Sequence, residues 1–325
     1  MPKSSSGARA CSTGPAPRGA WVTRLLCVAT LTLAAAPCDA ALTGAGSVAT
    51  AYSFILAAQF ERADANLART CPPAPVEACR VLEAVSLWWR IQIDPTNRTR
   101  DQRFNQRAAA AIASTAAWTK REPGRAEAWF YYAASYAPLV QWQILRGERI
   151  AAARNGNRIR EALEQTLRLD PALADAHFGI GLYEYYADVA SPAAKVFRWL
   201  LMLPGGDRVK GLKAIHETEM SGALLRDEAE FQLYQIDIWY EHKPGEALAV
   251  LKSLDEHYPF NPLFLQRMAE LYDTYLHDAR ASAAAWQQLA DRAHHDRVYD
   301  APRIAMLADR KRREIVARNP KIFDF

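Results

Sequence analysis

Three stretches of the sequence repeat one pattern, in which a helical run is ended by a proline and followed by a second amphipathic helix. They cover residues 110–137, 158–186 and 245–272. Proline ends the first helix of each pair because its ring and its missing N–H cannot continue the helix. A helical hairpin of this kind cannot bury its apolar face alone and must stack on neighbours. The repeats therefore predict an all-α fold of stacked hairpins.

Residue size follows the same pattern. Small residues recur where two helices must approach closely, at Ala111, Ala133, Gly181, Ala247 and Ala269. Large residues that fill the gaps between helices are Trp129, Tyr136, Leu163, Leu251 and Tyr272. Few stretches alternate apolar and polar residues, so strands have little support. We predict helices at about 45–69, 76–93, 100–121, 125–145, 149–169, 173–188, 192–203, 207–221, 223–241, 244–257, 261–277, 280–295 and 301–318.

These hairpins resemble the tetratricopeptide repeat (TPR). The turn proline and the small helix-A residue of that family fall on Pro123 and Ala133, Pro171 and Gly181, and Pro259 and Ala269. Its tryptophan and tyrosine positions fall on Trp129 and Tyr136 in the best-matching unit. In the other units His177 and Leu265 replace the tryptophan, Glu184 replaces the tyrosine, and the spacing is irregular. Residues 177–265 are also similar to the TPR family of eukaryotic outer-membrane and inclusion-body-clearance proteins.

The resemblance implies a right-handed TPR-like α-solenoid over residues 41–320, with 321–325 as a C-terminal tail. TPR proteins bind protein or peptide partners on a concave face lined by helix A. Carried over by alignment, this face comprises Glu127, Phe130, Asp175, Phe178, Leu182, Tyr185, Tyr186, Gln266, Glu270 and Asp273. Its aromatic and acidic character predicts a partner peptide with apolar anchors and basic ends. The aromatic stripes at 87–93 and 129–142 have two interpretations, as core packing or as a groove for an extended peptide.

The first 40 residues form a separate segment. A basic lead precedes a short apolar run at 25–36, and small residues suited to cleavage follow near Ala40. This order is typical of a secretory signal peptide, and the run is too short to span a bilayer. Lipid attachment at Cys38 is an alternative, although Pro37 does not suit the usual lipobox. We therefore predict an exported protein that is periplasmic or associated with the cell envelope.

Charge argues against nucleic acid as a partner. The whole chain has a formal net charge of +4, but the leader holds most of the excess of cations. Once residues 1–40 are removed, the net charge is near +1 and no sustained basic stripe remains along the sequence. Electrostatic binding to a phosphate backbone needs such a stripe. We expect a protein or peptide partner, with peripheral membrane contact as a further possibility.

Two cysteines follow the leader, Cys71 and Cys79, on either side of a proline-rich turn. An isolated pair in an exported protein predicts a disulfide, with two free thiols as the alternative. The turn supplies too few other ligands for a metal site. The segment HETEM (216–220) lacks the second histidine of a zinc-protease helix. Glu184 and Asp188 could share a helix face, but no nucleophile motif accompanies them. We expect neither enzyme activity nor a metal or cofactor.

Residues 192–208 read PAAKVFRWLLMLPGGDR. A helix at 192–203 would rise about 16 Å, roughly half of a bilayer core, so it cannot span a membrane. We predict a buried helix closed by a glycine turn, with Asp207 capping the next helix and Arg208 pairing with Asp207 or Asp188. In one alternative the helix at 192–203 forms a wall that faces an apolar ligand or a membrane. In another the glycine turn binds a phosphate.

The sequence therefore predicts an exported, non-catalytic scaffold that binds a protein or peptide through the concave face of a helical array. The alternative function is a membrane-associated helical protein that binds a lipid or another hydrophobic ligand, with residues 192–203 as a wall or a membrane contact.

Overall fold

The computed structural model describes residues 42–190, 195 and 204–320. Every regular element within these ranges is an α-helix, so the all-α prediction is confirmed. The predicted signal peptide at 1–40, the body of the predicted helix at 192–203 and the tail at 321–325 lie outside the described residues. All described residues fall within one compact unit of the chain.

The helices begin and end close to where the sequence places them. Their bounds are α1 (Ala45–Leu56), α2 (Phe60–Thr70), α3 (Val76–Ile93), α4 (Asp101–Arg121), α5 (Ala126–Arg146), α6 (Arg149–Leu169), α7 (Ala174–Val189), α9 (Arg208–Ser221), α10 (Arg226–Trp239), α11 (Pro244–His257), α12 (Pro262–Thr274), α13 (Ala279–His294) and α14 (Ala301–Arg318). Proline stands at the first turn of α11, α12 and α14. Its fixed φ suits that position, where the missing N–H is not needed.

The single long helix predicted at 45–69 is wrong, because the chain breaks between α1 and α2. Ala58 has a φ of 55°, in the left-handed region, and is fully buried. The N–H of Gln59 donates to the carbonyl of Phe54 at 2.9 Å, which closes the end of α1. Phe60 then starts α2 and is fully buried. Neither proline nor glycine marks this break, so it depends on the burial of Ala58 and Phe60 rather than on local propensity.

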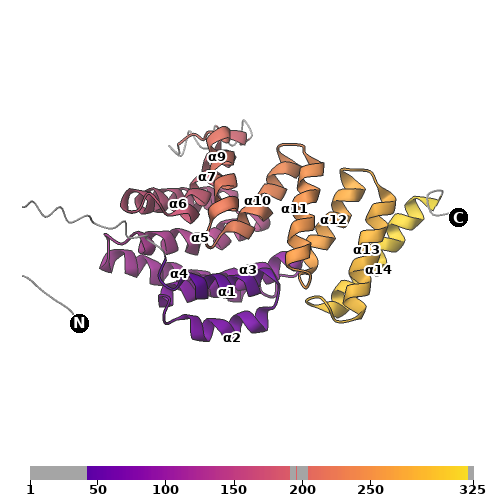
Figure 1. Ribbon diagram of the computed structural model, residues 1–325, viewed down its shortest axis with the longest axis horizontal. Helices are drawn as coiled ribbons and strands as arrows, with labels where there is room; N and C mark the ends of the chain where they lie inside the picture. The colour runs from indigo at the N-terminus through magenta and orange to yellow at the C-terminus, as the bar shows by residue number, and fades with distance from the viewer. Residues whose placement is uncertain (1–41, 191–194, 196–203, 321–325) are drawn as a thin grey trace, which may run out of the picture. The chain divides into compact units, whose positions relative to one another are not determined.

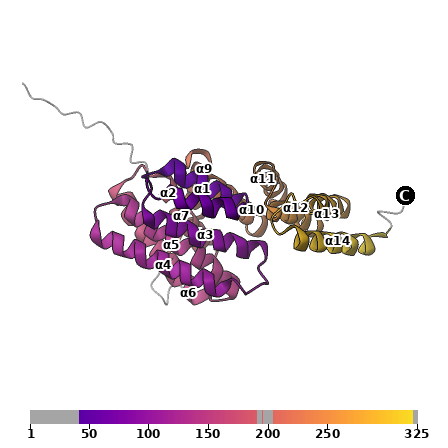
Figure 2. The ribbon, with the colours of Figure 1, turned by 90° about the horizontal axis from the view of Figure 1, so that it is seen from below.

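Consecutive helices pack against each other along the described chain, from the α1–α2 pair to the α13–α14 pair. Figures 1 and 2 show α12, α13 and α14 side by side, coloured orange to yellow. Contacts between distant segments come from α3, which also packs on α1, α5 and α12. Trp89 of α3 lies 5.3 Å from Phe231 of α10 and 6.2 Å from Phe264 of α12, measured between ring centroids. One aromatic cluster therefore joins the N-terminal helices to the later ones.

Small residues permit a close helix crossing between α7 and α9. A Cβ atom on Gly211 would lie 2.6 Å from the carbonyl oxygen of Gly181 and 2.6 Å from the backbone nitrogen of Tyr185. A Cβ on Gly181 would in turn lie 2.9 Å from the carbonyl oxygen of Gly211. The prediction that Gly181 stands where two helices approach closely is therefore confirmed.

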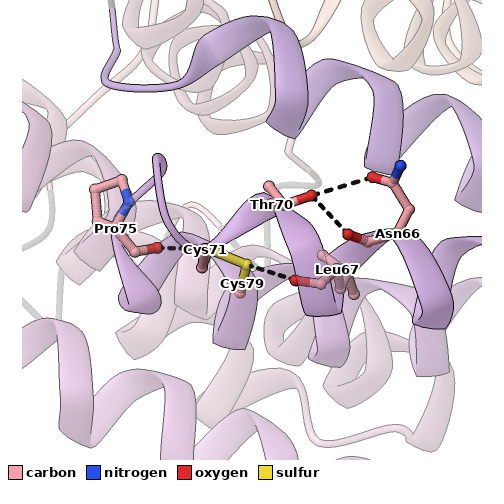
Figure 3. The surroundings of a disulfide bond; sticks show 6 residues. All are labelled: Asn66, Leu67, Thr70, Cys71, Pro75 and Cys79. Atoms are coloured by element: carbon pink, nitrogen blue, oxygen red, sulfur yellow. Dashed lines mark hydrogen bonds between the residues drawn. A yellow bond between two sulfur atoms is a disulfide. The ribbon is translucent and has the colours of Figure 1, made fainter.

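The predicted disulfide between Cys71 and Cys79 is confirmed, with the two sulfur atoms 2.03 Å apart (Figure 3). It joins the end of α2 to the first turns of α3. The hydroxyl of Thr70 donates to the carbonyl of Asn66 at 3.0 Å, and the Cys79 sulfur lies 3.6 Å from the Leu67 carbonyl. The bond therefore holds the α2–α3 turn closed.

Replacing both Cys71 and Cys79 by serine should lower the free energy of unfolding by about 2–3 kcal/mol. A short closed loop restricts the unfolded chain by about this amount. Urea unfolding of the double variant and of the parent protein measures the difference, and mass spectrometry of an unreduced digest identifies the linked peptides. Peptides that carry Cys71 and Cys79 as separate thiols would contradict the assignment.

Candidate binding groove

A groove of about 1710 Å³ is formed by residues from α1, α3, α5, α6, α7, α10 and α12. This volume exceeds the roughly 300–1,000 Å³ typical of small-molecule sites. Large apolar and aromatic side chains make up most of its walls. Representative residues are Trp88 and Trp89 of α3, Phe130 of α5, Phe178 and Leu182 of α7, and Phe231 of α10. The groove therefore has a volume large enough for a segment of a macromolecule.

The aromatic stripes of α3 and α5 are packed in the core and also contribute to the groove wall. Trp89 and Tyr131 are almost fully buried and also line the groove. Tyr131 stacks on Trp118 of α4 with 6.2 Å between ring centroids, so one face of its ring packs against the core. Each stripe thus packs between helices on one side and forms groove wall on the other, because an aromatic ring is large enough to reach both.

A buried carboxyl group lies on the groove floor. Glu228 of α10 accepts a hydrogen bond from the Tyr52 hydroxyl at 2.7 Å and one from the Gln232 amide at 3.2 Å. Burial raises the pKa of this carboxyl above its ordinary value, and the hydrogen bonds oppose the rise. Nearby in the groove wall, the Trp88 indole donates to Gln141 at 2.8 Å. The Tyr52–Glu228 bond therefore joins α1 to α10, and the Trp88–Gln141 bond joins α3 to α5.

Among the described residues, two polar atoms of the groove wall are buried without a hydrogen-bond partner. They are the hydroxyl oxygen of Tyr131 and the side-chain nitrogen of Gln92. Tyr131 is only 3% exposed, and burial raises the pKa of its phenol. A buried polar group without a partner costs about 1–3 kcal/mol.

Half of the residues predicted to bind a partner lie on this groove. Phe130, Asp175, Phe178, Leu182 and Tyr186 all line it. They come from two different hairpins, with Phe130 on α5 and the others on α7. The helix-A alignment therefore brings together residues that the fold also brings together.

The other five predicted residues do not belong to the groove lining. Glu127 accepts a hydrogen bond from the Thr43 backbone at 2.8 Å and pairs with Arg125. Tyr185 is fully buried and donates to Glu241. The remaining three lie on α12, where ion pairs or hydrogen bonds within the protein hold them: Gln266, Glu270 and Asp273.

Asp175 has a structural contact besides its place on the groove. Its carboxylate accepts hydrogen bonds from the backbone N–H groups of Leu224, at 3.1 Å, and Leu225, at 3.0 Å. These donors immediately precede α10 and have no partner within the helix. Burial raises the pKa of the Asp175 carboxyl, and the backbone hydrogen bonds oppose that rise. The aspartate therefore fixes the start of α10 against α7.

Sequence reasoning missed the contribution of α10 and α6 to the groove. Neither α10 nor its residues Glu228, Phe231 and Gln232 belong to the three repeats that suggested a binding face. One signal was available, because the segment AEFQLYQIDIW (229–239) places apolar residues around most of the helix circumference. A helix of that kind is usually buried on several sides.

The turn after residue 203 agrees with its prediction in one respect, the cap at Asp207. The Asp207 carboxylate accepts hydrogen bonds from the backbone N–H groups of Val209 and Lys210, both at 3.1 Å, so the predicted cap is confirmed. The backbone N–H of Arg208 donates to Asp188 at 3.0 Å, but the predicted pairing of the Arg208 side chain with Asp207 or Asp188 is wrong. The Arg208 guanidinium, however, pairs with Glu241, a residue distant in sequence. Asp207 thus takes up the N–H groups that a phosphate would need.

Further observations limit the kinds of site that the described residues can form. Their helices are either too short or too polar to cross a bilayer. Within the same part of the chain, no cluster of three or more His, Cys, Asp and Glu side chains is placed to hold a metal ion. No protein-family model matches the chain, and no curated protein matches it. The function is therefore inferred from the groove itself.

Proposed function

We propose that this chain is a non-catalytic binding protein that holds an apolar segment of a partner protein in the groove. One observation carries the proposal. Phe130, Phe178, Leu182 and Tyr186, which the TPR alignment assigns to a ligand-binding face, line a single apolar groove of about 1710 Å³. In interfaces of this kind, a few aromatic and aliphatic anchors contribute most of the affinity.

The polar groups of the groove favour a helical segment over an extended peptide. An extended peptide exposes backbone N–H and C=O groups that must find new partners when they are buried. Several polar side chains on the wall are already bonded within the protein, as Glu228 is to Tyr52 and Gln232. An amphipathic helix satisfies its own backbone and offers an apolar face to a hydrophobic groove. We therefore infer that the occupant is such a helix.

We also infer a TPR-like right-handed solenoid and an exported location. Packing between consecutive helices supports the first inference, because repeats in a solenoid contact mainly their neighbours. The Cys71–Cys79 disulfide supports the second, because disulfides persist in oxidising compartments. On this view the partner is a protein of the periplasm or the cell envelope.

A photo-crosslinking amino acid placed at Leu182 tests the proposed function. Leu182 lines the groove and is half-buried, whereas Met306 on α14 is exposed and lies outside the groove lining. Irradiation of the envelope fraction should yield a protein adduct from position 182 and none from position 306. The mass of the adduct separates the proposed function from its alternative. An adduct of lipid mass would show that the groove holds a hydrophobic ligand rather than a partner protein. Equal adducts from both positions would contradict the assignment of the groove as the binding site.

A substitution gives the matching loss of function. Leu182→Glu places a charge on the apolar wall and should weaken partner binding at least 10-fold, because a buried charge must lose its hydration. Met306→Glu makes the same chemical change on a surface outside the groove and should leave the affinity unchanged. Titration against the identified partner measures both, and thermal unfolding confirms that both variants are folded. Equal affinities for the two variants would remove the α7 wall from the site.

A further inference from the structure

Two connections that are distant in sequence lie side by side at one end of the helices. The α3–α4 connection covers residues 94–100, and the α5–α6 connection follows Arg146. The Arg146 guanidinium donates twice to the Asp101 carboxylate, both at 2.8 Å, and once to the Pro95 carbonyl at 2.7 Å. This single side chain therefore joins the end of α5 to the start of α4.

Three large aliphatic side chains are exposed at this end, in the mouth of the groove. Ile144 is 61% exposed, Ile150 is 52% exposed and Leu145 is 40% exposed. All three line the groove. Exposed aliphatic residues that occur singly need no explanation, but a contiguous group at the mouth of an apolar groove marks a contact surface.

Exposed arginines lie in the α3–α4 connection and in the first turns of α4 and α6. Arg98, Arg103, Arg149 and Arg154 are exposed, and none of them forms an ion pair with another described residue. The acidic groups nearby are mostly neutralised: Asp101 pairs with Arg146, and Asp94 lies 3.7 Å from Arg303. Glu148 stays exposed between the two connections. The surface therefore has an excess of positive charge that the near-neutral sequence does not suggest.

We propose that this surface, formed by Ile144, Leu145, Ile150, Arg98, Arg103, Arg149 and Arg154, docks on an anionic lipid bilayer. The arginines contact the lipid head groups, and the three aliphatic side chains enter the boundary between head groups and acyl chains. The combination of cations with bulky aliphatic groups fits a bilayer better than it fits single-stranded nucleic acid, for which aromatic side chains that stack on the bases would be expected. Docking at this end places the mouth of the groove on the membrane surface.

This inference goes beyond the proposed function, because it concerns where the groove opens rather than what the groove holds. An apolar segment at a membrane surface could reach the groove without first being exposed to water, since the groove mouth and the docking surface share Ile144 and Ile150. The two proposals can fail separately. Crosslinking from Leu182 reports on the groove, and binding to lipid vesicles reports on the docking surface.

The test compares two variants of the full chain that lose the same side chains in different places. The docking variant carries Arg103→Gln, Arg149→Gln, Arg154→Gln and Ile150→Ser. The control variant carries Arg310→Gln, Arg312→Gln, Arg313→Gln and Met306→Ser, all at exposed positions of α14. Both lose three positive charges and one exposed apolar side chain, so general effects of net charge and of the N-terminal leader are the same in both.

Sedimentation with phosphatidylcholine vesicles that contain 30% phosphatidylglycerol, in low salt, measures binding. One arginine near an anionic surface contributes about 5-fold in affinity. The docking variant should therefore bind at least 20-fold more weakly than the parent protein, and the control variant less than about 3-fold more weakly. High salt should weaken the parent protein as well, because salt screens exposed charges. Thermal unfolding checks that both variants are folded.

Several outcomes would overturn the proposal. Equal losses in the two variants would show that net charge or the leader, and not this surface, drives binding. Unchanged vesicle binding by the docking variant would exclude the surface as a membrane contact. Loss of binding to duplex DNA by the docking variant, with vesicle binding intact, would assign the surface to nucleic acid instead.

Discussion

Gly211→Ala should destabilise the protein by about 3 kcal/mol, although it adds only one methyl group. The new Cβ atom would lie 2.6 Å from backbone atoms of Gly181 and Tyr185, which belong to the facing helix α7. Backbone atoms within a helix cannot move aside singly, so the whole α7–α9 crossing must open. Overpacking of this kind costs about 1–3 kcal/mol, and occasionally more. Thermal or urea unfolding followed by circular dichroism measures the loss.

Gly156→Ala is the matched control, because it makes the same chemical change inside α6. No atom lies within 4 Å of a Cβ built on Gly156. Alanine is a better helix former than glycine by about 0.5–1 kcal/mol, so this variant should be slightly more stable than the parent protein. The two substitutions thus have opposite signs. If both raised the stability, the close crossing of α7 and α9 would be excluded.

Asp175→Ala should also destabilise the protein strongly, by about 2–4 kcal/mol. The substitution removes the carboxylate that accepts from the backbone N–H groups of Leu224 and Leu225, and it leaves those donors at the start of α10 without a partner. Loss of a cap costs about 1 kcal/mol, and each unsatisfied buried donor costs about 1–3 kcal/mol. Urea unfolding measures the change in the free energy of unfolding.

Asp175→Asn distinguishes this structural role from the binding role that the TPR alignment assigns to Asp175. Asparagine keeps one acceptor oxygen, so its stability should lie between that of the parent protein and that of the alanine variant. A direct role in binding predicts another result. In that case Asp175→Ala would keep its stability and lose affinity for the partner, which would contradict the assignment of Asp175 as the residue that fixes α10.

Local patterns were sufficient to predict most helices and the disulfide. The bounds predicted for 76–93, 149–169, 244–257 and 301–318 match the structure at both ends, because apolar periodicity and proline or polar breaks mark them. The Cys71–Cys79 bond was predictable because the two cysteines stand eight positions apart, on either side of a proline-rich turn. The break at Ala58 was not predictable. Alanine favours a helix, and only burial against the rest of the fold holds Ala58 in a left-handed conformation.

The sequence predicted the residues of the candidate site only where they lie together on a single helix. The periodicity of α7 places Phe178, Leu182 and Tyr186 near one another, so an alignment to a repeat family could find them. Glu228 and Tyr52 are 176 positions apart in the chain, and no local pattern predicts their hydrogen bond. The alignment also assigns Gln266, Glu270 and Asp273 to the binding face, but these residues do not line the groove.

The sequence by itself determined the helices, their small and large faces and the disulfide, because each depends on residues within one or two turns of each other. Only the tertiary structure decided that α3, α5, α7 and α10 surround one groove, and that Arg103 and Arg149 stand at the same end of it. Net charge and periodicity average over neighbours in sequence, whereas a surface forms from residues that folding brings together.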